Sequence, residues 1–348
     1  MTRPQRPHFA SIDALRGFAA FSVVLFHLGG AGLPKLASPT TTRLTSWGWT
    51  GVEVFFVISG FVIPFVMMKA DYHWRDAGNF LARRFVRIWP PSAMLIALTI
   101  AQFVVINRMS AGHGGWTSLS TLRILANLAY IVPFTDQSWL NGILWTLSVE
   151  FQYYLFLALA FPLFAANRYW LVAACAASLL TPLLPFAESA LFLKYAGYFA
   201  FGGLALLYRE GRLGVPAMLG LLALGAAAAT LELGILPTAF AAATTLIIAF
   251  IPIRSRVLIF LGTISYSLYL THMLVASTSE FLLLRLFHPT SAVERLGAQM
   301  ACLAIVILGA WLFYLLVERH FVSWSHHLAG APRRDGEEAG GVVSAPGL

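Results

Sequence analysis

The sequence predicts an all-α, polytopic membrane protein with about ten transmembrane helices and both termini in the cytoplasm. The first observation behind this fold class is composition: of 348 residues, 59% are hydrophobic and only 11% are charged. The second is that the apolar residues fall into long runs separated by short charged segments. Because a soluble domain of this length needs far less apolar sequence, we interpret the runs as membrane spans.

Each predicted span is an apolar run close to the ~20 residues that cross the hydrocarbon core of a bilayer. The runs lie at residues 12–29, 49–68, 88–106, 143–165, 169–187, 190–208, 214–231, 234–252, 257–284 and 296–317. The apolar stretch 119–134 is short for a span, and we expect an outer-face or re-entrant helix there. Residues 1–328 are therefore expected to form one membrane domain. A disordered cytoplasmic tail rich in Gly, Pro and charge is expected at 329–348.

The third observation is the placement of the basic residues. With the N-terminus inside, most of the 23 Lys and Arg residues flank the cytoplasmic ends of the runs, as the positive-inside rule requires. They are dispersed among loops, so the net charge of +8 does not indicate a nucleic-acid-binding face. The first run follows Arg3 and Arg6, as in a signal peptide. Arg16 and His27 inside the run favour a retained helix.

Cysteine usage argues against covalent cross-links and against a thiolate metal site. The two cysteines, Cys175 and Cys302, lie in separate apolar runs. Both are interpreted as small core residues, and no bound metal is expected.

Ionisable residues inside the predicted spans are candidate functional residues, because each costs roughly 2.5–3.5 kcal/mol at the centre of a bilayer. Arg16 and His27 are separated by about three helical turns, so they face the same way about 16 Å apart along the axis. Asp13 lies one turn before Arg16 and can share that face. This pattern indicates either an acid, a base and an imidazole serving one site, or a polar stripe that packs against other helices.

The segment 79–91, NFLARRFVRIWPP, carries Arg84 and Arg87 on one helical face. We expect a short amphipathic segment at the inner surface, followed by a helix with Pro90 and Pro91 in its first turn. Two guanidinium groups on one face can bind a phosphate with paired hydrogen bonds. The alternative is that arginines at an inner boundary serve only membrane topology.

Two further carboxylates are predicted in or near spans. Glu150, in the stretch 144–156, requires a cationic or hydrogen-bonding partner, which His27 or an arginine would supply. The alternative is a structural pair that fixes helix packing. Glu53, in the stretch 51–61, lies near the outer end of its run.

Tyr266, Tyr269 and His272 recur every three residues in GTISYSLYLTHM, residues 262–273. This spacing places them on one side of a helix. They either line a cavity there or make helix–helix hydrogen bonds.

These five stretches, in this order, resemble the acyltransferase-3 family of integral membrane acyltransferases. The resemblance rests on DALRG with His27 (R-x10-H), GVEVFFVISGF, Arg84-x-x-Arg87, WTLSVE and SYSLYLTH, over about residues 9 to 320. The family usually has Gly where this chain has Ala14 and often Asp where it has Glu53, which leaves the role of Glu53 open. Some members carry an added extracytoplasmic hydrolase-like domain, and this sequence resembles the stand-alone form.

The resemblance implies transfer of an acyl group, usually acetyl, from cytoplasmic acyl-CoA to a hydroxyl of a surface polysaccharide, a lipid-linked glycan or a related acceptor. It also implies a bacterial inner membrane. No metal is required, because a thioester is already activated, and a neutral imidazole can take the proton of the acceptor hydroxyl. By role, the expected residues are His27, Glu150 and Asp13 for catalysis, Arg16, Arg84 and Arg87 for acetyl-CoA, and Glu53, Tyr153, Tyr266, Tyr269 and His272 for substrate binding.

Two other classes of protein stay open from the sequence. A proton-coupled transporter or exporter would use His27, Glu150 and Asp13 as a proton relay, although no internal repeat is evident. A non-catalytic membrane scaffold has no need for several buried ionisable groups. For an enzyme, direct transfer in a ternary complex and a transient acyl-His27 are both compatible with the sequence.

Overall fold

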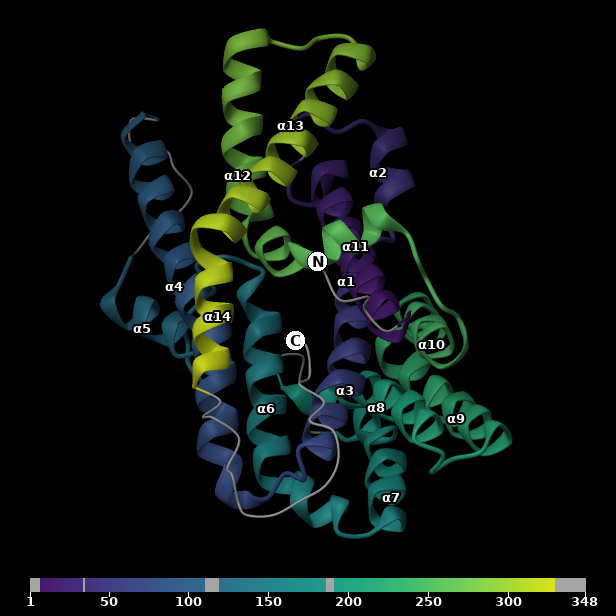
Figure 1. Cartoon of the computed structure of the whole chain (residues 1–348). Coiled ribbons are helices and arrows are strands. Elements are labelled where there is room, and N and C mark those ends of the chain that lie inside the picture. The colour runs from purple at the N-terminus through teal and green to yellow at the C-terminus, as the bar shows by residue number, and fades with distance from the viewer. Residues whose placement is uncertain (1–6, 34, 110–118, 186–190, 329–348) are drawn as a thin grey trace, which may run out of the picture.

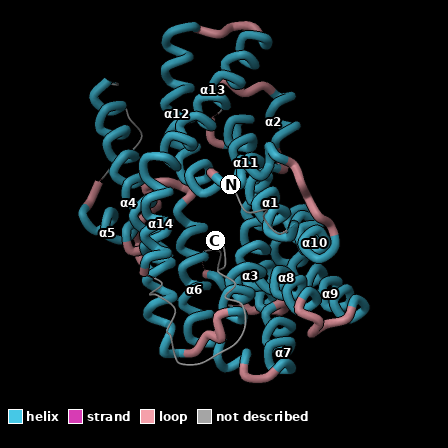
Figure 2. Tube along the Cα trace, in the orientation of Figure 1, coloured by secondary structure: helices cyan, strands magenta, loops and turns pink. Residues whose placement is uncertain are grey.

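The computed structural model of the chain describes residues 7–33, 35–109, 119–185 and 191–328. Over these residues the chain folds into helices joined by turns and loops, with no strand (Figure 1; Figure 2). The predicted all-α fold class is therefore confirmed. The tail expected at 329–348 lies outside the described residues.

Fourteen α-helices are described, and two of them continue into π-helical turns. In chain order they are α1 (Pro7–Phe26), α2 (Pro39–Thr45), α3 (Gly51–Lys69), α4 (Ala77–Met109), α5 (Thr121–Leu128), α6 (Leu144–Ala165), α7 (Arg168–Ser178), α8 (Phe192–Arg209), α9 (Val215–Leu233), α10 (Ile235–Phe250), α11 (Arg256–Thr263), α12 (Ser265–Phe287), α13 (Ala292–Phe313) and α14 (Arg319–His327). The π turn His27–Ala31 follows α1, and the π turn Tyr314–Glu318 joins α13 to α14. Such turns are rare and often occur at functional sites.

Seven helical stretches among the described residues are long and apolar enough to cross a membrane. They are Ala10–Ala31, Pro39–Lys69, Trp74–Arg108, Leu144–Ala165, Val215–Leu233, Ser265–Phe287 and Ala292–His327. The chain is thus a multi-pass membrane protein. The expected number of ten is not confirmed: α7 and α10 are shorter than a span, and α8, in the expected run 190–208, is not among the seven. The sidedness of the termini stays a prediction.

Two predicted segments are divided differently from expectation. The run 257–284 is broken at Ile264 into the short α11 and the long α12. The stretch 119–134 forms α5 and the 3₁₀ turn Val132–Phe134, and neither is long enough to span a bilayer.

Helix α4 corrects the expected break before its prolines. Pro90 and Pro91 lie in the interior of one continuous helix, Ala77–Met109, and not in its first turn. Proline has no N–H to donate, so the helix lacks two of its internal hydrogen bonds here. Tertiary contacts support the region instead, and one of them is the Tyr266 hydroxyl, which donates to the Ile88 carbonyl at 2.7 Å. The arginines just before the prolines therefore belong to a spanning helix.

Helix α1 is fixed against α11 by close backbone contact (Figure 1). A Cβ added to Gly17 would lie 2.0 Å from the Leu258 carbonyl oxygen, and one added to Gly262 would lie 2.0 Å from the Asp13 carbonyl oxygen. Only glycine permits such an approach. The contact fixes the part of α1 that carries Asp13 and Arg16.

Candidate active site

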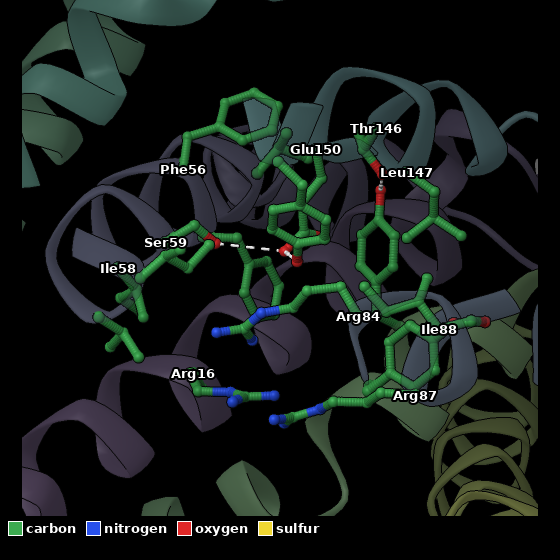
Figure 3. Close-up of a pocket in the computed structure, with 17 residues that line it drawn as sticks. Arg16, Phe56, Ile58, Ser59, Arg84, Arg87, Ile88, Thr146, Leu147 and Glu150 are labelled. Carbon is green, nitrogen blue, oxygen red and sulfur yellow. Dashed lines mark hydrogen bonds between the residues drawn. The ribbon is translucent and has the colours of Figure 1, made fainter. Parts of the chain in front are cut away.

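A cavity of about 110 Å³ lies among α1, α3, α4, α6 and α12 (Figure 3). The structure brings six of the predicted residues to its lining: Arg16, Arg84, Arg87, Glu150, Tyr266 and Tyr269. The hydroxyls of Ser59, Thr146 and Tyr154 also line it, and most of the remaining lining is apolar. The cavity therefore combines charged side chains with an apolar surface that comes mostly from α3.

Three guanidinium groups, those of Arg16, Arg84 and Arg87, point into the cavity (Figure 3). Arg16 Nε donates to Ser265 Oγ at 3.2 Å, and the Arg84 guanidinium lies over the Tyr154 ring at 5.5 Å from its centroid. Within the described part of the chain, no carboxylate oxygen comes within 4 Å of any of the three. Their remaining N–H donors face the cavity, an arrangement that suits an anion.

Glu150 faces the three arginines from α6. Its Oε1 accepts a short hydrogen bond from the Tyr154 hydroxyl and another from Ser59 Oγ at 3.4 Å. With three arginines and one glutamate, the lining carries a formal charge of +2. An anion with two negative charges would complement it.

His27 and His272 form a pair beside the cavity and are not among its lining residues. Their ring centroids are 4.9 Å apart, and His272 Nε2 lies 3.3 Å from His27 Nδ1. His27 Nδ1 also lies 3.0 Å from the Val23 carbonyl oxygen, and His272 Nδ1 lies 2.6 Å from that of Tyr269.

These contacts fix the tautomer of each neutral ring. A carbonyl oxygen only accepts hydrogen bonds, so both Nδ1 atoms carry the proton. His272 Nε2 then has a lone pair, and the single Nδ1–H of His27 is shared between this lone pair and the Val23 carbonyl oxygen. His27 Nε2 is left with its lone pair available to take a proton, as a general base requires.

Tyr269 connects the cavity to the histidine pair. Its hydroxyl lies 2.9 Å from Thr146 Oγ1 in the cavity lining, and its ring centroid lies 5.8 Å from that of His272. Phe55 meets the same ring at 5.7 Å. Tyr269 therefore lies between the arginine cavity and the imidazoles and contacts both.

A family model described as an acyltransferase domain matches residues 9–315. The chain belongs to the acyltransferase-3 family. The resemblance drawn from the sequence is thereby confirmed, over nearly the same range of residues.

The named relatives of this acyltransferase-3 member are two O-acetyltransferases and a membrane-bound transacylase. "Putative peptidoglycan O-acetyltransferase YrhL" of Bacillus subtilis is 28% identical over 158 residues, and "O-acetyltransferase OatA" of Staphylococcus aureus is 26% identical over 155 residues. Each alignment covers 42% of this chain but only 23% and 24% of those two proteins. "Putative membrane-bound transacylase BcsY" of Komagataeibacter xylinus is 27% identical over 93% of this chain and 86% of its own length. No solved structure matches the chain.

Besides the two histidines, three residues predicted for the site lie outside the cavity lining. Asp13 lies one turn from Arg16 but does not line the cavity. Glu53 is only 4% exposed, and its Oε2 has no hydrogen-bond partner among the described residues. Tyr153 packs its ring 4.0 Å from that of Phe199 and lines a second, apolar cavity bounded by α6, α7 and α8.

Sequence reasoning missed several residues of the candidate site. Tyr154 follows Glu150 by one helical turn, and that i, i+4 spacing was a usable signal. Ser265 is 249 positions from Arg16, so no local pattern links them. Across the described residues, no group of three His, Cys, Asp or Glu side chains could hold a metal ion.

Proposed function

We propose that the chain transfers an acetyl group from acetyl-CoA to a hydroxyl of a carbohydrate acceptor at the bacterial inner membrane. The observation that carries the proposal is the cavity with three guanidinium groups, none of which forms an ion pair within the described residues. Membership of the acyltransferase-3 family and relatives named as O-acetyltransferases support the reaction class. The donor, the acceptor and the role of each residue are part of the proposal.

The arginines bind the phosphates of the donor. A diphosphate carries about two negative charges and presents oxygens in the geometry that guanidinium groups hold best. This matches the formal +2 of the lining. In the predicted topology these arginines lie toward the cytoplasm, where acyl-CoA is made.

His27 acts as the general base through Nε2. The acceptor hydroxyl loses its proton to Nε2 as its oxygen forms a bond to the thioester carbonyl carbon. The carbon–sulfur bond then breaks, and the proton passes from His27 to the departing CoA thiolate. His272 Nε2 accepts from the Nδ1–H of His27 and so stabilises the imidazolium that forms between these steps.

The carboxylates and tyrosines support this reaction. Glu150, held by Tyr154 and Ser59, limits the positive charge of the cavity and orients the guanidinium groups. Asp13, outside the cavity lining, offsets part of the positive charge of Arg16. Tyr269 lines the path that the acyl group takes from the cavity to His27.

The test is acetyl-CoA binding to the purified full-length protein in detergent, for the wild type, Arg87→Ala and Arg83→Ala. Arg83 is the matched control because it lies on the same helix but donates to Asn79 at 3.2 Å and does not line the cavity. Loss of one charge-assisted contact costs about 1.5–3 kcal/mol, so Arg87→Ala should bind about 10- to 100-fold more weakly. Arg83→Ala should bind like the wild type.

Absence of acyl-CoA affinity in the wild type would overturn the proposal. A proton-coupled transporter would then be the hypothesis to test. The measurement would be the flux of a small molecule into vesicles in the absence of acyl-CoA. Equal weakening by both arginine substitutions would also contradict the proposal, because it would indicate a general effect of surface charge.

A further inference from the structure

A buried glutamate that lies outside every motif of the sequence contacts the first turn of α12. Glu318 is 4% exposed and is the last residue of the π turn Tyr314–Glu318. Ser267 donates to its Oε2 twice, from the backbone N–H at 3.1 Å and from Oγ at 2.5 Å. A carboxylate is thus brought by α13 to the beginning of another helix.

Helix α12 has no capping side chain of its own. The residue before its first turn is Ile264, and an isoleucine offers no oxygen to the free N–H groups there. The first N–H groups of a helix have no intrahelical partner, and the helix dipole favours a negative charge beside them. Glu318 supplies both the acceptor and the charge from outside the helix.

The capped turn also holds an arginine of the cavity. Ser265, two residues before Ser267, accepts from Arg16 Nε at 3.2 Å. This is the one hydrogen bond recorded for the Arg16 side chain across the described residues. The direction in which the Arg16 guanidinium points therefore depends on the position of this turn.

The same segment reaches the helix that carries the other arginines. Directly after Glu318, α14 packs along α4 (Figure 1). Glu318 does not line the cavity itself and lies more than 4 Å from the guanidinium groups of Arg16 and Arg87. It is therefore well placed to organise the arginines without occupying the place of a ligand.

We propose that Glu318 is a positioning residue for donor binding. Its carboxylate caps α12, the capped turn fixes Ser265, and Ser265 aims the Arg16 guanidinium into the cavity. The inference rests on the proposed function in one respect, namely that Arg16 binds the phosphates of acyl-CoA. Nothing in the family motifs assigns a role to this glutamate.

The experiment compares Glu318→Gln with Glu280→Gln in the full-length protein. Glu280 is the matched control: it is 6% exposed and also accepts from a backbone amide, that of Leu36 at 3.1 Å, but it does not line the cavity and its contact is at the other end of α12. A charge-assisted hydrogen bond is roughly twice as strong as a neutral one, so Glu318→Gln should weaken acetyl-CoA binding about fivefold. The maximal rate should stay close to that of the wild type, and Glu280→Gln should change neither quantity.

A double-mutant cycle tests whether Glu318 acts through Arg16. In an Arg16→Ala background, Glu318→Gln should cause no further loss of affinity, because the group that it positions is gone. An equal loss in both backgrounds would overturn the proposal. Should Glu318→Gln fail to fold, Ser265→Ala, which removes only the last link, should give the same weakening and the same cycle.

Amide hydrogen exchange separates this inference from the proposed function. Glu318→Gln should speed exchange in the first turn of α12, while Glu280→Gln should leave it unchanged. Unchanged exchange in Glu318→Gln would overturn the capping role even where acetyl-CoA binds. If exchange is faster in Glu318→Gln but the wild type binds no acyl-CoA, the capping role would be supported. The role of the cap in donor binding would then be overturned.

Discussion

The arginine cavity and the histidine pair are built in opposite ways. In the cavity, Arg16 uses one N–H on Ser265, and the other guanidinium donors face open space. In the pair, both Nδ1 atoms of the two rings lie within hydrogen-bond distance of carbonyl oxygens, and His272 Nε2 faces the other ring. The cavity thus leaves N–H donors for a ligand, whereas the histidine pair leaves one lone pair, that of His27 Nε2, to accept a proton.

This difference indicates two kinds of task. Unpaired cations that face a cavity repel one another and are stabilised when an anion arrives, so the cavity is suited to binding. Rings whose tautomers are fixed lose no energy to reorientation during proton transfer, so the pair is suited to chemistry. Substitutions in the cavity should therefore change affinity, and substitutions in the pair should change turnover.

The largest expected effect is on turnover, from His27→Ala. Removal of a general base lowers the rate by about 10²- to 10⁴-fold, and acetyl-CoA affinity should stay within about twofold of the wild type. CoA release measured with a thiol reagent gives the rate, and calorimetry gives the affinity. Retention of most of the activity would exclude His27 as the base. The division between a binding cavity and a catalytic histidine pair would then be wrong.

The next largest effect is on folding stability, from a substitution in the contact between α1, which carries Arg16, and α11. Gly17→Ala would place a methyl group 2.0 Å from the Leu258 carbonyl oxygen. Such overpacking costs about 1–3 kcal/mol of folding stability. Thermal unfolding in detergent should show the loss for Gly17→Ala and not for Gly78→Ala, because a Cβ at Gly78 meets nothing within 4 Å. Equal behaviour of the two variants would mean that the two helices can separate without cost.

A smaller effect is expected from His272→Gln, which sharpens the division of roles within the pair. Loss of the contact to His27 Nδ1 removes one hydrogen bond worth about 1–1.5 kcal/mol, so the maximal rate should fall about tenfold. The Michaelis constant for acetyl-CoA should not change. If the Michaelis constant of the acceptor rose while the maximal rate held, His272 would be a substrate-binding residue, as the sequence first suggested.

The smallest effect is expected from Tyr154→Phe. The substitution removes the hydroxyl that donates to Glu150 and keeps the ring beneath Arg84. Acetyl-CoA affinity should change by about two- to fivefold, since one hydrogen bond is lost and no charge is removed. Isothermal titration measures it, and Tyr153→Phe is the control because Tyr153 faces the second, apolar cavity. A larger loss in the control would indicate that the apolar cavity takes part in donor binding.

Much of the molecule followed from local pattern. Apolar runs of spanning length predicted an all-α membrane protein, because no other arrangement satisfies the backbone in lipid at such lengths. The sequence motifs also identified six residues that line one cavity: Arg16, Arg84, Arg87, Glu150, Tyr266 and Tyr269. Arg16 and Glu150 were conspicuous because ionisable groups inside apolar runs are costly. The other four were conspicuous because their spacing places them on one side of a helix.

The tertiary structure decided the rest, since it depends on contacts between distant parts of the chain. No local rule predicts that α4 continues through Pro90 and Pro91, because the support for that region comes from Tyr266 on another helix. Nor does any pattern pair His27 with His272, which are 245 positions apart, or bring Glu318 to the first turn of α12. The sequence by itself thus determined which polar groups are buried at a cost in free energy. Only the packing of distant helices determined which hydrogen-bond partners offset that cost.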